Sequence, residues 1–155
     1  MFSERFGFSW LGLIVFILPM LINIVFFITE KNADTPQNPC PYKWIEIIEQ
    51  SARVLLAAAL CVLVSNQRTQ WSSPFFILSI LFLILYYIVW IRYFAGGMDA
   101  GLLSEKFLFV PIPLAVFPVL YFLFAALWLH NGIAAIIVCI FGAAHYAVSY
   151  FNLCK

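Results

Sequence analysis

Charged and polar side chains recur at helical spacing in the stretch from Lys43 to Val62. Glu46, Glu49, Gln50 and Arg53 follow the pattern i, i+3, i+4, i+7, so we expect them to share one face of a helix. Glu49 precedes Arg53 by four residues, which is the spacing of an intrahelical ion pair. A carboxylate can transfer protons, and a guanidinium can bind an anionic group.

A second polar face lies near the end of the chain, where His145, Ser149 and Asn152 are spaced i, i+4, i+7. Arg53 and His145 each lie about eight residues inside an apolar segment, roughly 12 Å deep at about 1.5 Å per residue. We therefore expect His145 to reach the level of the Glu49 and Arg53 pair. Glu49 and His145 are the candidate catalytic acid or base.

Other apolar segments place polar residues at the same end. The full set of predicted ligand-binding residues is Asn23, Glu46, Glu49, Gln50, Arg53, Arg92, Tyr93, His145, Ser149 and Asn152. These residues could instead have structural roles. Arg92 could anchor its helix at the lipid head groups, and Glu46 could lie at the water interface. The remaining charged residues could pack against neighbouring helices or fix their register. An ionisable group inside a membrane costs about 2.5 to 3.5 kcal/mol, which favours a functional site.

The composition requires a lipid environment for these residues. Of 155 residues, 65% are hydrophobic and 10% are charged, and the mean hydropathy is +1.03. No water-soluble domain of this size could cover so much apolar surface. The net charge of +1 offers no basic field, so we expect no nucleic-acid partner. The first apolar run is too long for a signal peptide and lacks an A-x-A-like cleavage site.

We predict an all-α, polytopic integral membrane protein in which residues 1–155 form a single domain. Its compact bundle has five transmembrane helices, at about 8–29, 44–65, 75–94, 107–130 and 132–152. The short loops make consecutive helices antiparallel. The second segment is uninterruptedly apolar only from Val54 to Val64, about half of a roughly 30 Å hydrocarbon layer. The alternative is therefore four spans plus one re-entrant or interfacial helix.

The basic residues predict the orientation. Arg5 and Arg68 fall on one side, whereas the other side receives Lys31, Lys43, Arg53, Arg92, Lys106 and Lys155. The positive-inside rule makes the second side cytoplasmic. We expect a multi-pass plasma-membrane protein with its N-terminus outside and its C-terminus in the cytoplasm.

The cysteines and histidines predict no metal and no cofactor. The four cysteines form no C-x-x-C pair, and the two histidines stand toward opposite membrane faces. Cys40 and Cys154 lie outside the apolar runs and could form a disulfide only in an oxidising compartment. Nucleotide-binding and hydrolase motifs are also absent.

The proline-broken stretch from Val110 to Pro118 and the polar residues near it predict a polar vestibule facing the cytoplasm. Our first hypothesis is that this cavity binds, or helps to move, an amphiphilic or anionic small molecule or lipid. Arg53, with Arg92 as a second candidate, would bind its anionic head group. The second is an enzyme that modifies a lipid or isoprenoid through Glu49 and His145. The third is an accessory subunit. The expected partners are the lipid bilayer, an amphiphilic ligand, and a second copy or another membrane protein.

Overall fold

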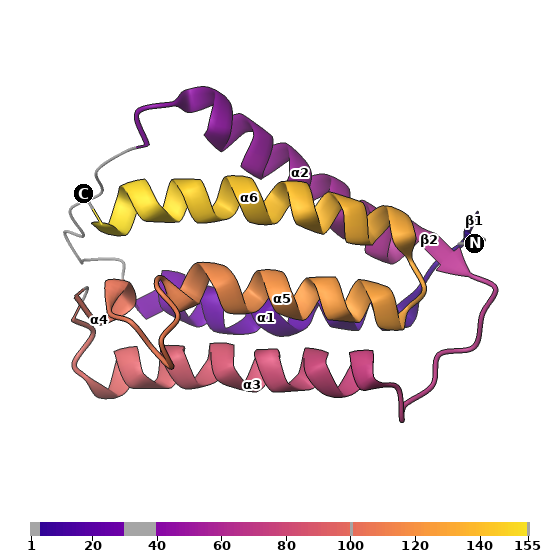
Figure 1. Ribbon diagram of the computed structural model, residues 1–155, viewed down its shortest axis with the longest axis horizontal. Coiled ribbons are helices and arrows are strands. Elements are labelled where there is room, and N and C mark those ends of the chain that lie inside the picture. The colour runs from indigo at the N-terminus through magenta and orange to yellow at the C-terminus, as the bar shows by residue number, and fades with distance from the viewer. Residues whose placement is uncertain (1–3, 30–39, 100, 155) are drawn as a thin grey trace.

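The computed structural model describes residues 4–29, 40–99 and 101–154, which are mostly helical. Long helices extend along the longest axis of the molecule (Figure 1). They are α1 (Trp10–Thr29), α2 (Lys43–Val62), α3 (Pro74–Ala95), α5 (Pro113–Trp128) and α6 (Gly132–Cys154). A short helix, α4 (Gly101–Ser104), precedes α5. Strands β1 (Glu4–Phe6) and β2 (Leu63–Ser65) form an antiparallel pair at one end.

Within the described part of the chain, three helices are long and apolar enough to cross a membrane. They are Trp10–Thr29, Pro74–Ala95 and the Gly132–Asn152 portion of α6. Helix α5 is also apolar but has only 16 residues. Helix α2 has 20 residues, and its charged side chains lower its hydropathy. The protein is therefore a helical membrane protein.

Two helix boundaries differ from the sequence prediction by three residues or more. Helix α5 begins at Pro113 rather than at residue 107, because Phe107 and Val110 bond to each other across a tight turn. Leu108 and Phe109, at the tip of this turn, have φ values of 48° and 66°. Helix α2 ends at Val62, and the next three residues pair with β1 instead of continuing the helix.

The core is centred on α5, which packs against α1, α3 and α6. Its buried residues include Tyr121, Phe122, Ala125 and Ala126. Helix α2 packs against α6 and touches α1. The contact with α1 is close: a Cβ atom on Gly12 would lie only 1.8 Å from the carbonyl oxygen of Leu60. Small residues thus allow backbones to approach one another, as in many membrane helix pairs.

Pro19 interrupts the hydrogen bonding of α1 in the middle of the bundle. Because proline has no N–H, the carbonyl of Val15 loses its usual helical donor. The Tyr121 hydroxyl from α5 donates to that carbonyl at 2.9 Å. The Tyr87 hydroxyl from α3 donates to Leu18 O, one residue before the proline, at 2.6 Å. Two tyrosines therefore fix α1 to its neighbours around this proline.

The end of the bundle that carries β1 and β2 is held by two polar side chains. The Glu4 carboxylate accepts hydrogen bonds from the backbone N–H groups of Gly132 and Ile133, at 2.6 and 3.1 Å. The buried Asn131 side chain donates to Ala59 O and Leu63 O and accepts from the N–H of Ala134. These bonds cap the first turn of α6 and attach it to β1 and α2.

Candidate functional site

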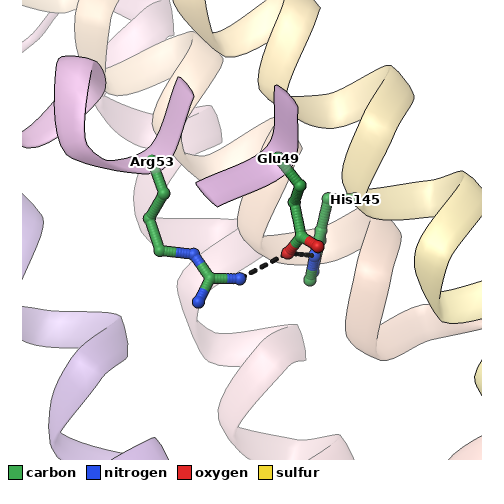
Figure 2. Close-up of polar contacts among 3 residues, drawn as sticks. All are labelled: Glu49, Arg53 and His145. Atoms are coloured by element: carbon green, nitrogen blue, oxygen red, sulfur yellow. Dashed lines mark hydrogen bonds and ion pairs between the residues drawn. The ribbon is translucent and has the colours of Figure 1, made fainter. Parts of the chain in front are cut away.

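A buried carboxylate lies between α2 and α6. Glu49 is 4% exposed, and its Oε1 atom accepts hydrogen bonds from Arg53 Nη2 and His145 Nδ1 (Figure 2). The distance from His145 Nδ1 to the carboxylate oxygen is 2.9 Å. Because Nδ1 donates this bond, the proton of a neutral His145 is on Nδ1 and Nε2 keeps a free lone pair. The structure therefore brings together the three residues for which the sequence predicted acid–base or anion chemistry.

Helical periodicity explains why these residues meet. Glu49, Ala52, Leu56 and Ala59 are buried at spacings of three and four residues, so one stripe of α2 faces the bundle. The two alanines in this stripe keep the α2 backbone close to its neighbours. Glu49 lies at the N-terminal end of the stripe, opposite His145 on α6.

The Arg53 guanidinium is oriented by two contacts. It donates to Glu49, and its Cζ atom lies 5.8 Å from the centre of the Phe141 ring, within cation–π range. Phe141 in turn stacks on the His145 ring, with centroids 5.0 Å apart. The Arg53 side chain is still 39% exposed. Glu49 occupies one nitrogen, so other guanidinium N–H groups can bind an incoming acceptor.

A second polar contact crosses from α1 to α3. The Tyr86 hydroxyl donates to Asn23 Oδ1 at 2.7 Å, and the Tyr86 side chain is 4% exposed. The ring of Trp90 packs edge-on against Tyr86, with centroids 6.3 Å apart. Among the described residues, no acceptor makes a hydrogen bond with good geometry to the buried Trp90 Nε1.

Other predicted site residues lie outside the cluster of Glu49, Arg53 and His145, which we call the Glu49 cluster. Gln50 is exposed, whereas Glu46 and Ser149 are half-buried without a described contact to Glu49. Arg92 forms an ion pair with Glu105. Tyr93 is fully buried among aromatic rings.

Asn152 is half-buried near the end of α6. Its Oδ1 atom is buried and lacks a hydrogen-bond donor within the described residues. The predicted polar face of α6 is therefore divided: His145 joins the Glu49 cluster, whereas Asn152 lies two turns further along the helix.

Sequence reasoning missed Phe141, which contacts Arg53 and His145, and also Tyr86 and Trp90, which belong to the contact between α1 and α3. Tyr86, Trp90 and the predicted Tyr93 are spaced i, i+4, i+7, so one face of α3 carries aromatic rings with polar tips. This spacing could have identified Tyr86 and Trp90 from the sequence. Phe141 precedes His145 by four residues, which places its ring against the imidazole.

In the described part of the chain, no group of three His, Cys, Asp or Glu side chains could hold a metal ion. Cys40 is a buried free thiol. The side chain of Cys154 lies outside the described residues, as do Lys31 and Lys155, which contributed to the predicted orientation.

The Glu49 cluster combines an oriented guanidinium with an imidazole whose Nε2 carries a lone pair. This arrangement can bind an anionic oxygen or transfer a proton. The chain matches no protein-family model, no curated protein and no solved structure.

Proposed function

We propose that the protein is a five-span membrane protein that binds the anionic head group of an amphiphile at Arg53. The observation that carries this proposal is the double contact of the buried Glu49 with Arg53 and His145. The carboxylate holds the guanidinium in place, and the half-exposed guanidinium keeps donors for a ligand. Such preorganisation lowers the cost of binding an anion within a membrane.

The contacts at the β1 end support five crossings. Helix α1 has the length and hydropathy of a span, yet β1 before it pairs with β2 after α2. A chain that crosses in α1 must therefore return in α2. In the same way, α3 leads away from this end, and Glu4 caps the start of α6 there, so α5 must return.

The outer surface of α2 also supports a lipid-facing position. Ile47, Val54 and Leu55 are exposed, whereas Glu49 is buried. An apolar outside with a charged inside suits a helix surrounded by lipid rather than by water. At about 1.5 Å per residue, the length of α2 matches a hydrocarbon layer of about 30 Å.

Positive charge supports the proposed orientation. Among the described residues, Lys43, Arg92 and Lys106 lie at the end where α2 begins and α3 ends, whereas Arg5 and Arg68 lie at the β1 end. The first end is then cytoplasmic in the plasma membrane. In this orientation Glu49 lies in the cytoplasmic half of the bilayer, and Arg53 lies near the middle of α2.

The test is retention of lipid by the purified protein. The wild-type protein, Arg53→Gln and the control Gln50→Ala are purified in a neutral detergent, and bound amphiphiles are extracted and identified by mass spectrometry. We expect Arg53→Gln to retain about tenfold less of an anionic amphiphile, because a charge-assisted hydrogen bond is lost. Gln50→Ala should retain the wild-type amount. Equal retention by all three proteins would refute the proposal.

The contact between His145 Nδ1 and Glu49 favours a second candidate function, an enzyme that acts on a lipid or isoprenoid. A carboxylate at Nδ1 orients an imidazole so that Nε2 can act as a general base. The amphiphile identified by retention is then incubated with the wild-type protein and His145→Gln. Loss of product with unchanged retention would establish the enzyme, whereas absence of turnover in the wild type leaves binding as the function.

A further inference from the structure

An open cavity of about 320 Å³ lies at the β1 end of the bundle, away from Arg53. It is formed by the start of α1, strand β2 and the turn that follows β2. Polar side chains in its lining come from Ser9, Ser65, Gln67, Arg68 and Thr69. Cavities that bind small molecules begin at about 300 Å³, so a head group or small anion would fit.

The two serines present hydrogen-bond donors. Ser9 Oγ accepts from the backbone N–H of Gly12 at 3.0 Å, and Ser65 Oγ accepts from the N–H of Gln67 at 3.2 Å. A serine oxygen that accepts in this way still carries its own proton. Each hydroxyl can therefore donate to a ligand. Ser9 also precedes the first turn of α1, and the N-terminal end of a helix carries positive potential.

The charge of the lining favours an anion. Arg68 lines the cavity, and no carboxylate does. The nearest acidic residue in the strand pair is Glu4, opposite Ser65. Its carboxylate is already bound to the first N–H groups of α6. An anion would therefore meet one guanidinium and several hydroxyl donors.

Apolar side chains form the rest of the lining, among them Leu11, Leu63 and Leu129. Hydrogen-bond donors beside an apolar surface suit a ligand that is anionic at one end. We propose that this cavity binds an oxyanion of the phosphate class, carried by a lipid head group or present as the free ion. This site is independent of the one at Arg53.

The experiment uses the full chain with Arg53→Gln, so that binding at the first site does not contribute. Phosphatidylglycerol or phosphatidylcholine is added in mixed micelles, and bound lipid is counted by native mass spectrometry. Inorganic phosphate is titrated separately by calorimetry. Each measurement is repeated with Arg68→Gln and with Arg5→Gln added. Arg5 is an exposed cation at the same end but does not line the cavity.

We expect Arg68→Gln to weaken binding about tenfold, because a charge-assisted contact is removed, and Arg5→Gln to leave it unchanged. If this difference appears only with phosphatidylglycerol, the ligand is a lipid head group; if it appears with inorganic phosphate, it is the free ion. The proposal is overturned if neither lipid nor phosphate binds, or if both lipids bind equally and phosphate does not bind. It is also overturned if Arg68→Gln and Arg5→Gln weaken binding equally. If Arg68→Gln does not fold, Arg68→Lys and Ser65→Ala replace it. We expect Arg68→Lys to bind the ligand as before and Ser65→Ala to bind it more weakly.

Discussion

Glu49 is the residue on which the polar contacts between α2 and α6 depend. It is buried, and Arg53 and His145 both donate to it. In Glu49→Ala both donors lose their acceptor, and the positive charge of Arg53 loses its compensation. Because Arg53 is partly exposed, the relevant cost is that of lost hydrogen bonds to a charged group, and we expect the free energy of unfolding to fall by about 2 kcal/mol. Chemical or thermal unfolding in detergent measures it.

The matched control for this prediction is Gln50→Ala, the next residue along α2. Gln50 is exposed, so its replacement should change the unfolding free energy by no more than about 0.5 kcal/mol. Glu49→Gln should fall between the two, since an amide oxygen still accepts a hydrogen bond but carries no charge. A Glu49→Ala protein as stable as Gln50→Ala would show that the cluster contributes nothing to the fold.

At the scale of residues, spacing was a good guide to contacts within one helix. The four-residue interval predicted the Glu49–Arg53 pair, and counting residues from the polar end placed His145 at the same level. The interval could not show that Gln50 faces outward, because the buried stripe of α2 is narrower than its polar face. The link from Asn23 to Tyr86 depends on which helices are neighbours, and a single sequence does not contain that information.

Among the helices, the join between α1 and α5 makes a specific prediction about proline. Tyr121→Phe removes the donor to the Val15 carbonyl and leaves a buried acceptor without its partner. The expected loss in unfolding free energy is about 1 kcal/mol. In Pro19→Ala the helix regains an N–H at position 19 that can bond to Val15, so the same tyrosine substitution should then cost less.

The four proteins of this double-mutant cycle are the wild type, the two single variants and the double variant. Their unfolding free energies in one detergent give the coupling between Pro19 and Tyr121. A coupling of zero would mean that the Tyr121 hydroxyl does not compensate for the proline.

The crossing of α1 and α2 makes a second prediction for the helices. A methyl group on Gly12 would collide with the Leu60 carbonyl oxygen, which is backbone and cannot rotate away. Gly12→Ala should therefore separate the two helices and lower the unfolding free energy by about 1 to 3 kcal/mol. Gly7→Ala is the matched control, since its Cβ would meet Val64 at an ordinary 3.4 Å. The prediction is wrong if both variants unfold like the wild type.

The apolar runs of the sequence located the long helices, because a lipid-exposed backbone must bond to itself. They did not predict β1 and β2, which have three residues each and depend on contact between distant parts of the chain. They also placed the start of α5 too early. Phe107 to Val110 are as apolar as the helix that follows, but Pro113 disfavours helical backbone at Ile112, and the chain enters α5 through a left-handed residue there, with φ of 51°.

At the scale of the whole molecule, different kinds of contact connect the helices at the two ends of the bundle. Hydrogen bonds from Glu4 and Asn131 attach the β1 end of α6 to β1 and α2. Toward the other end, α2 and α6 are joined by the Glu49 cluster and by aromatic side chains such as Tyr42 and Phe151. A ligand at Arg53 would thus act where the helices are linked by side chains rather than by backbone pairing.

The number of membrane crossings can be tested by finding the side of the membrane on which the residues before α1 and after α2 lie. The pairing of β1 with β2 predicts that both lie on the same side. In a cysteine-free background, single cysteines replace Arg5, Gln67 and Met98, and each is labelled in intact cells with a maleimide that does not cross membranes. All three positions are exposed. If α2 crosses the membrane, positions 5 and 67 share the outer side and react, whereas position 98 reacts only after the cells are opened. Labels at positions 5 and 67 on opposite sides would mean that α2 does not cross and that the bundle has four spans. If position 98 alone reacted in intact cells, five spans would remain and the orientation would be reversed.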